Sequence, residues 1–420
     1  MASSNGRVFF DPLSRPDSEE SSAQLALDAG GSYLLYVYQQ QVRASEDFGN
    51  PNIDLSFTVP AINDLIQNAE FSPTHCVLNF EAGFTSAILR LGKGNPPGSD
   101  DGSEDVNVRD NMVALMDAVK AANPGVKFAY YQIPGHRTDF IAGTTVYDVV
   151  SNPNTVFDAG GQSLTGADWM QSRFEERWNA NQPIIEASDF LAPSAYDKYP
   201  FNEIGSTTRG NINNVGADDA TLLSRRQVHD GWGLNEHVAV RKDLVMGMCQ
   251  YMRQQMGRPF MPIVPFVNQY YQPKGNIREP NDYYMPLYVS LDDYIEKQIR
   301  PFMDGGATSI IQWGSDQFFG GKPFDPTIVV DSSEAFQDSH DPWREVAVWE
   351  FPGVFGFEEP VDRINNWRNV EWCPNDSPNA ELRDALRIAM RDRRLEYIRR
   401  ASQFVKTYGA ARASTLAALA

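Results

Sequence analysis

Short apolar runs alternate with amphipathic stretches along most of the chain. Six runs have the length and the β-branched and aromatic content of strands, and they lie at residues 32–41, 74–84, 126–135, 188–200, 259–271 and 307–321. Stretches with helical spacing of apolar residues separate them, such as VRDNMVALMDAVKAAN, which stops before Pro124, and SLDDYIEKQIRPFMDGG, which stops at two glycines. This alternation is typical of a parallel sheet built from βα units.

Polarity within these runs is uneven, because each run begins apolar and ends in polar or aromatic residues. These ends are Gln39 to Gln41, Asn79 and Glu81, Tyr131 and Gln132, Tyr196 and Asp197, Asn268 and Tyr270, and Trp313 and Asp316. The carboxyl ends of the strands of a βα barrel converge on its active site. The pattern therefore favours a TIM-like (β/α) barrel over a doubly wound sheet. With one or two further strands near residues 7–10 and 145–150, it predicts a barrel of seven or eight strands.

The pattern also divides the chain into four segments. Residues 1–30 are interpreted as an N-terminal arm, residues 31–320 as the barrel, and residues 321–378, rich in Pro, Trp and acids, as an irregular extension packed on it. The segment 379–420 begins with a basic amphipathic helix and ends in a tail of small residues. That helix has two interpretations: a final barrel helix with a solvated Arg face, or a surface for self-assembly.

Composition and charge narrow the class of protein. With 420 residues and 42% hydrophobic content, the chain is long enough for one large domain with additions. The formal net charge of -19 argues against nucleic acid as the main partner, because phosphate binding needs clustered Lys and Arg. No apolar stretch approaches the roughly 20 residues of a membrane span, and the N-terminus lacks the pattern of a secretory signal. We therefore expect a cytoplasmic protein, or one released from cells or carried on a virion.

The sequence contains no recognisable motif for binding a metal or a cofactor. The three cysteines, Cys76, Cys249 and Cys373, are far apart and lack the spacing of metal ligands, so we expect reduced thiols. The chain has neither a GxSxG nucleophile motif nor an HExxH zinc motif, and its Gly-rich loop at 92–105 lacks the spacing of a phosphate loop. The expectation is a site without metal or cofactor.

The run CVLNFEAGF is the clearest candidate for chemistry. Alternate residues of a strand share a face, so Asn79 and Glu81 point together at the strand's carboxyl end. An apolar setting raises the pKa of a carboxyl group, which suits a general acid that protonates a leaving oxygen. The alternative is a structural Glu81 that pairs with a neighbouring strand end.

Other strand ends carry the groups that a glycosidase uses to bind sugars. Trp313 suits a sugar-stacking floor, and Tyr130, Tyr131, Tyr196 and Tyr270 offer hydroxyl groups and ring edges. Asp197 and Asp316 are candidate second carboxylates. Gln132 and Asn268 complete the set of predicted substrate-binding residues.

The order of these segments resembles that of hyaluronidases and related glycoside hydrolase barrels, over roughly residues 30 to 320. That family has a D-x-E motif at an early strand end, an aromatic strand before a Pro turn, P-S-x-Y, a Pro/Tyr-rich strand, and I-x-W-G-S after a Gly-Ala-rich helix end. The corresponding stretches here are NFE at 79–81, YYQIPG at 130–135, PSAY at 193–196, PIVPFVNQYY at 262–271 and GGATSIIQWGS at 305–315. The last of these is the most specific.

The resemblance implies roles for individual residues. Glu81 would be the general acid/base, Tyr196 would orient the substrate's acetamido group, and Trp313 would line the site. The family uses the substrate's own acetamido oxygen as nucleophile, held and charge-stabilised by the first Asp of D-x-E. Here that position is Asn79, whose amide accepts a hydrogen bond but cannot offset the developing positive charge.

Two functions from different classes follow. The first is a glycoside hydrolase that cleaves a polysaccharide through Glu81, either by a weakened substrate-assisted mechanism or with Asp197 or Asp316 as partner carboxylate. The second, favoured by Asn79 and by the basic C-terminal helix, is a carbohydrate-binding or structural protein of a virion or surface assembly, built on a glycosidase-like barrel.

Overall fold

The computed structural model describes residues 6–10, 22–43, 52–80, 84, 87–88, 103–133, 154, 156–159, 162–195, 234–265, 291–313 and 380–419. The predicted extension at 321–378 and the possible strand at 145–150 lie outside these residues.

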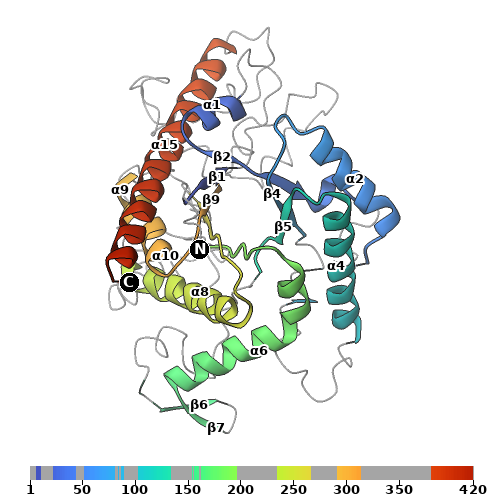
Figure 1. Ribbon diagram of the computed structural model, residues 1–420, viewed down its shortest axis with the longest axis vertical. Coiled ribbons are helices and arrows are strands. Elements are labelled where there is room, and N and C mark those ends of the chain that lie inside the picture. Colours follow the sequence, from blue (N-terminus) through green and yellow to red (C-terminus); the bar gives the residue numbers. More distant parts are fainter. Residues whose placement is uncertain are drawn as a thin grey trace, which may run out of the picture.

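The described strands form two parallel sheets and one antiparallel ribbon (Figure 1). One parallel sheet has the order β2-β1-β9-β8, from β2 (Ser32–Tyr33), β1 (Val8–Phe10), β9 (Ile310–Trp313) and β8 (Ile263–Pro265). The other has the order β3-β4-β5, from β3 (Leu35–Tyr38), β4 (His75–Asn79) and β5 (Lys127–Tyr130). The predicted α/β class with parallel strands is confirmed. The strand expected near residues 7–10 is β1, so part of the segment interpreted as an arm belongs to a sheet.

The two parallel sheets are linked at two places, once by the chain itself and once by isolated parallel bridges. β2 and β3 belong to one run, which pairs with β1 through Ser32 and Tyr33 and with β4 from Leu35 onward. At the other side, isolated parallel bridges join Tyr131 to Ala192, Leu191 to Phe260 and Ser194 to Ile263. The predicted run at 188–200 thus contributes single bridges between β5 and β8 where it is described.

The described helices lie around the strands (Figure 1). They are α1 (Ser22–Asp28), the short η1 (Gln39–Gln41), α2 (Leu55–Gln67), α4 (Ser103–Ala122), α6 (Gly166–Ala187), α8 (Leu234–Met256), α9 (Leu291–Asp293), η4 (Tyr294–Ile299), α10 (Arg300–Asp304) and α15 (Ala380–Leu419). No helix among these residues is long and apolar enough to cross a membrane.

The segment expected as one helix over 290–306 is interrupted by the π-helix η4. The expected double-glycine stop is present, and Gly306 takes a φ of 98°, which favours glycine.

The C-terminal helix α15 runs from Ala380 to Leu419 and therefore includes nearly all of the predicted tail. Its buried side chains Tyr397, Ala401 and Val405 belong to the same apolar cluster as Val8 of β1, so the helix packs against the sheet. Exposed Arg399 and Arg400 lie outside this face.

The ribbon of β6 (Val156–Ala159) and β7 (Gln162–Thr165) was not predicted. It pairs antiparallel and precedes α6 directly. The sequences VFDA and QSLT lack the alternation of apolar and polar residues that predicts a half-buried strand, and the side chain of Val156 is exposed.

Alternate side chains of the parallel strands enter two separate apolar clusters. The helix-facing cluster joins strand residues such as Leu35, Leu78 and Phe128 to helix residues such as Met112 and Val119. The second cluster, here called the strand-only cluster, is formed by the alternate residues, whose side chains point to the other face of the strands. Its members are Phe9, Leu34, Tyr36, Val77, Ala129, Tyr131, Phe190, Ala192, Met261, Ile263 and Ile311. Both faces of the strands are therefore buried, as expected for a parallel sheet.

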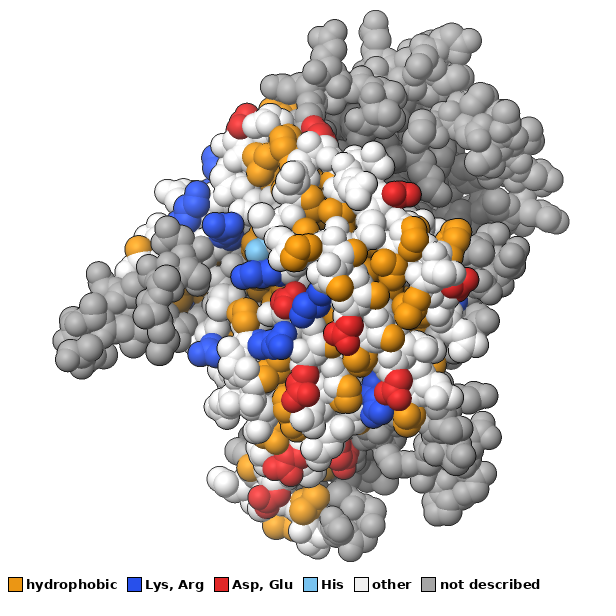
Figure 2. Space-filling model, turned by 45° about the vertical axis from the view of Figure 1, so that its right-hand side comes forward, with side chains coloured by type: hydrophobic (Ala, Val, Ile, Leu, Met, Phe, Trp, Pro, Cys, Tyr) orange, Lys and Arg blue, Asp and Glu red, His pale blue; other side chains and the backbone are white. Residues whose placement is uncertain are grey.

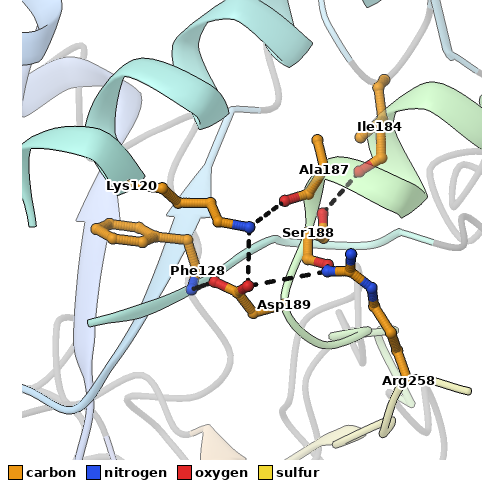
Figure 3. Close-up of polar contacts among 7 residues, drawn as sticks. All are labelled: Lys120, Phe128, Ile184, Ala187, Ser188, Asp189 and Arg258. Atoms are coloured by element: carbon orange, nitrogen blue, oxygen red, sulfur yellow. Dashed lines mark hydrogen bonds and ion pairs between the residues drawn. The ribbon is translucent and has the colours of Figure 1, made fainter. Parts of the chain in front are cut away.

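A charged network joins segments that precede the strands (Figure 3). Asp189 accepts from Phe128 N at 2.9 Å and pairs with Lys120 Nζ at 2.8 Å, while Arg258 lies at 3.8 Å and donates to Ser188 O. Lys120 also donates to Ala187 O, which ties the ends of α4 and α6 together. His75, Arg7 and Lys127 lie near Asp189 of this network. Figure 2 shows a group of Lys and Arg side chains, with Asp and Glu side chains among them, on one face of the molecule. The segments before the strands thus combine four cations, Arg7, Lys120, Lys127 and Arg258, with the carboxylate of Asp189.

Candidate functional site

Three neighbouring strands end in one layer of polar and aromatic residues. The register pairs Tyr38 of β3 with Asn79 of β4 and pairs Leu78 with Tyr130, so Asn79 lies beside Tyr131. Asn79 stands two residues after Val77 and therefore lies on the same face of β4. Tyr38 and Tyr131 both belong to or contact the strand-only cluster on this face. An amide is therefore flanked by two tyrosines at the carboxyl ends of the strands.

Asn79 is the polar centre of this layer. It is 9% exposed, and its Oδ1 has no hydrogen-bond donor among the described residues. Leaving a buried acceptor unpaired costs about 1 to 3 kcal/mol. A buried polar group kept at this cost is a common feature of binding sites.

The tyrosines form an aromatic wall below and beside the amide. The Tyr36 ring lies 5.1 Å from that of Tyr38 and 6.1 Å from that of Tyr131, at tilted and edge-on angles. Such rings combine a flat apolar face with a polar hydroxyl group, which suits sugar binding.

Gln132, directly after β5, is held in an unusual backbone conformation. Its φ of 61° lies in the left-handed region, and among the described residues it is the one non-glycine residue with a positive φ. Its backbone N donates to Ala192 O at 3.1 Å, and its Nε2 donates to the Tyr131 hydroxyl at 3.1 Å. Strained residues of this kind concentrate at functional sites, and this one orients Tyr131.

Ser194 is a second buried polar residue on the same face. It stands two residues after Ala192, a member of the strand-only cluster. It is 1% exposed, and its Oγ has no hydrogen-bond partner among the residues that the structure describes. Backbone bonds from Ala195 N to Ile263 O and from Ile263 N to Pro193 O fix the segment beside β8.

Tyr130, predicted to bind substrate, lies on the other face. Its hydroxyl donates to Met112 O of α4 at 2.8 Å, and its ring packs in the helix-facing cluster. Burial raises the pKa of the Tyr130 phenol well above its usual value. Because adjacent strand residues point to opposite faces, Tyr130 and Tyr131 cannot both line one site. Tyr130 therefore lies outside the candidate site, contrary to the prediction.

The structure brings together Asn79, Tyr131 and Gln132 of the predicted set. Trp313 is the last residue of β9. The remaining predicted residues, Glu81, Tyr196, Asp197, Asn268, Tyr270 and Asp316, lie outside the described residues.

Three site residues were not predicted: Tyr36, Tyr38 and Ser194. The two tyrosines were detectable, because they stand two apart in SYLLYVY and so share a face. Ser194 had no comparable signal, since one serine next to proline is common in loops.

Metal ligands do not cluster in the described part of the chain, where no three His, Cys, Asp or Glu side chains come together. Burial raises the pKa of the Cys76 and Cys249 thiols, so neither is a ready thiolate.

Comparisons with known proteins found no matching family model and no matching curated protein. Among solved structures, a monoclinic crystal form of bee venom hyaluronidase is similar with a TM-score of 0.39 and 13% identity, over 74% of this chain and 92% of that chain. The same enzyme in complex with a hyaluronic acid tetramer gives a TM-score of 0.38 and 15% identity, over 74% and 91%.

Proposed function

We propose that this protein is a glycoside hydrolase with a TIM-like barrel, in which Glu81 acts as general acid/base on a polysaccharide. The observation that carries the proposal is the buried Asn79 amide between Tyr38 and Tyr131 at the ends of parallel strands. Glu81 follows Asn79 by two residues, at the position where βα barrels hold their catalytic groups.

The barrel is supported by the series of parallel pairings. These run from β1 to β2, through the shared run to β3, β4 and β5, over the bridged residues 191–194 to β8, and from β8 through β9 to β1. That series corresponds to seven strand positions. The strand-only cluster contains no helix residue, as the filled interior of a barrel requires.

The proposed chemistry assigns distinct tasks to the residues. Glu81 in its acid form protonates the leaving oxygen, and the resulting carboxylate then activates water. Asn79 accepts a hydrogen bond from the sugar beside the bond that breaks. Tyr131, Gln132, Asn268, Tyr270 and Trp313 bind neighbouring sugar units, and Tyr196 orients the substrate.

Because the Asn79 amide is neutral, a second carboxylate is the better partner for positive charge that develops at the sugar ring. Asp197 and Asp316 are the candidates.

A second candidate function is carbohydrate binding without cleavage. The neutral Asn79 favours it, since an amide cannot stabilise a positive intermediate as a carboxylate does. Such a protein would bind a glycan and release no products.

The test is hydrolysis of a panel of polysaccharides, measured as new reducing ends. We expect wild-type protein to cleave one class, Glu81→Gln to lose at least about 100-fold in rate, and Glu70→Gln to keep the wild-type rate. Glu70 is an exposed carboxylate and serves as the matched control. Full turnover by Glu81→Gln would overturn the catalytic assignment, and binding without turnover by wild-type protein would favour the second function.

A further inference from the structure

We propose that Gln312 is a positioning residue for the proposed glycosidase. It fixes the carboxyl end of β9, where Trp313 follows it, through a hydrogen bond to Tyr294 of the π-helix η4. This inference rests on the proposed function and gives a task to a buried residue on the helix side of the sheet.

Gln312 lies on the helix side of a central strand. Ile310 of β9 belongs to the helix-facing cluster and Ile311 to the strand-only cluster, so Gln312 has the orientation of Ile310. Its backbone stands between Phe10 of β1 and Val264 of β8, and its side chain is 0% exposed. Burial of an amide is unfavourable unless the amide is hydrogen-bonded, so the strand that carries Gln312 depends on its partner.

The partner is the hydroxyl group of Tyr294. The Nε2 of Gln312 donates to this oxygen at 3.2 Å, and this is the one hydrogen bond of the Gln312 side chain among the described residues. Tyr294 is also fully buried. Burial raises the pKa of its phenol, so the hydroxyl group stays neutral and the bond persists across the neutral pH range.

Tyr294 is itself held by the surrounding helices. It begins η4, and π-helical turns are rare segments that often occur at functional sites. Its ring lies 5.3 Å from that of Tyr397 of α15, and Arg394 of the same helix lies near its phenol. The hydrogen bond therefore links β9 to α15 through a buried and packed ring.

This link acts on the site through the backbone of β9. Trp313, predicted to bind a sugar unit, is the next residue and the last of β9, and its backbone pairs with Pro265 of β8. Loss of the bond lets Gln312 and the end of the strand shift together. A displacement of about 1 Å can cost about 100-fold in rate, so even a smaller shift lowers the rate measurably.

Matched substitutions of two buried glutamines test the assignment. Gln298 of η4 is 0% exposed like Gln312, but neither atom of its amide has a hydrogen-bond partner among the described residues. Gln312→Met and Gln298→Met make the same chemical change at equal burial, and Gln312→Met alone removes a described hydrogen bond to η4.

The values of kcat and KM are measured on the polysaccharide that wild-type protein cleaves, and urea unfolding shows whether each variant is folded. We expect Gln312→Met to lower kcat about tenfold and to change KM less than about twofold, because the side chain touches no substrate. Gln298→Met is the control and should keep the wild-type kcat.

Tyr294→Phe removes the same hydrogen bond from the other partner and keeps the ring. It should lower kcat as far as Gln312→Met does, and the variant with both substitutions should lose no more, because the two residues act through one bond. A purely structural role would instead lower the stability of these variants and leave the kcat of folded protein unchanged. If Gln312→Met does not fold, Tyr294→Phe decides the question by itself.

The outcomes separate the two proposals. Losses of kcat in Gln312→Met and Tyr294→Phe that are not additive, and that are absent in Gln298→Met, support the inference. Wild-type kcat in Tyr294→Phe, additive losses, or an equal loss in Gln298→Met overturns it and leaves the glycosidase standing. No cleavage of any polysaccharide by wild-type protein overturns the proposed function, and the inference with it.

Discussion

Removal of the Asp189 carboxylate should lower the stability of the whole fold. Its Oδ2 accepts from Phe128 N at 2.9 Å, and its Oδ1 pairs with Lys120 at 2.8 Å (Figure 3). The hydrogen bond to a charged acceptor contributes about 1.5 to 3 kcal/mol. The side chain is 25% exposed, so screening leaves the ion pairs with Lys120 and Arg258 about 0 to 1 kcal/mol. We therefore expect Asp189→Ala to lower the free energy of unfolding by about 2 to 3 kcal/mol.

Urea unfolding followed by tryptophan fluorescence measures this loss. Asp189→Asn keeps an oxygen for Phe128 N and removes the charge, so its loss should be about half as large. Asp392→Ala is the matched control, because Asp392 pairs with Arg391 at 3.1 Å but is 59% exposed, and we expect less than about 0.5 kcal/mol. If Asp189→Ala and Asp392→Ala shift the unfolding midpoint equally, the assigned role of the network is wrong.

Three further predictions concern separate parts of the fold. Burial, together with Lys127 and Arg7, lowers the pKa of His75 to about 4, below its unfolded value of 6.5, so stability is lost as pH falls from 6.5 toward 4. Since His75 is only half-buried, this loss should be about 1 to 2 kcal/mol, and it should disappear from the pH dependence of urea unfolding in His75→Phe. Tyr130→Phe should lower the free energy of unfolding by about 1 kcal/mol and leave glycan binding unchanged, whereas Tyr131→Phe should weaken glycan binding. Calorimetry with the polysaccharide that wild-type protein cleaves measures this binding, in a Glu81→Gln background that prevents turnover. Gly31→Ala would place a Cβ 2.7 Å from Phe10 Cδ1 and 2.9 Å from Ala26 O, so thermal unfolding should show a loss of stability of about 1 to 3 kcal/mol. Gly125→Ala is the control and should not lower stability, because its Cβ would meet no atom within 4 Å. Equal effects of the two members of either pair would contradict the corresponding prediction.

The parallel α/β organisation was predictable because it depends on local periodicity. Helices such as α4 and α8 bury one stripe of apolar residues. The middle of β4, Cys76 to Leu78, is apolar on both faces because both faces are covered. The β6 and β7 ribbon, with the sequences VFDA and QSLT, shows neither signal and was missed.

The candidate site was predictable only in part. Its position at strand ends follows from polarity along single runs, which identifies Asn79 and Tyr131. The choice between Tyr130 and Tyr131 depends on which face of β5 meets α4, and this is a tertiary fact. Asp189 joins residues 61 and 69 positions away, and no short-range pattern indicates such partners.

Cleavage in oxygen-18 water tests the central claim most directly. Wild-type protein is incubated with the polysaccharide that it cleaves in the panel, and the products are analysed by mass spectrometry beside those of Glu81→Gln. A glycoside hydrolase places one oxygen-18 atom at each new reducing end, and Glu81→Gln should form almost none of these products. Unlabelled or unsaturated products, or labelled products formed equally by Glu81→Gln, would contradict hydrolysis through Glu81.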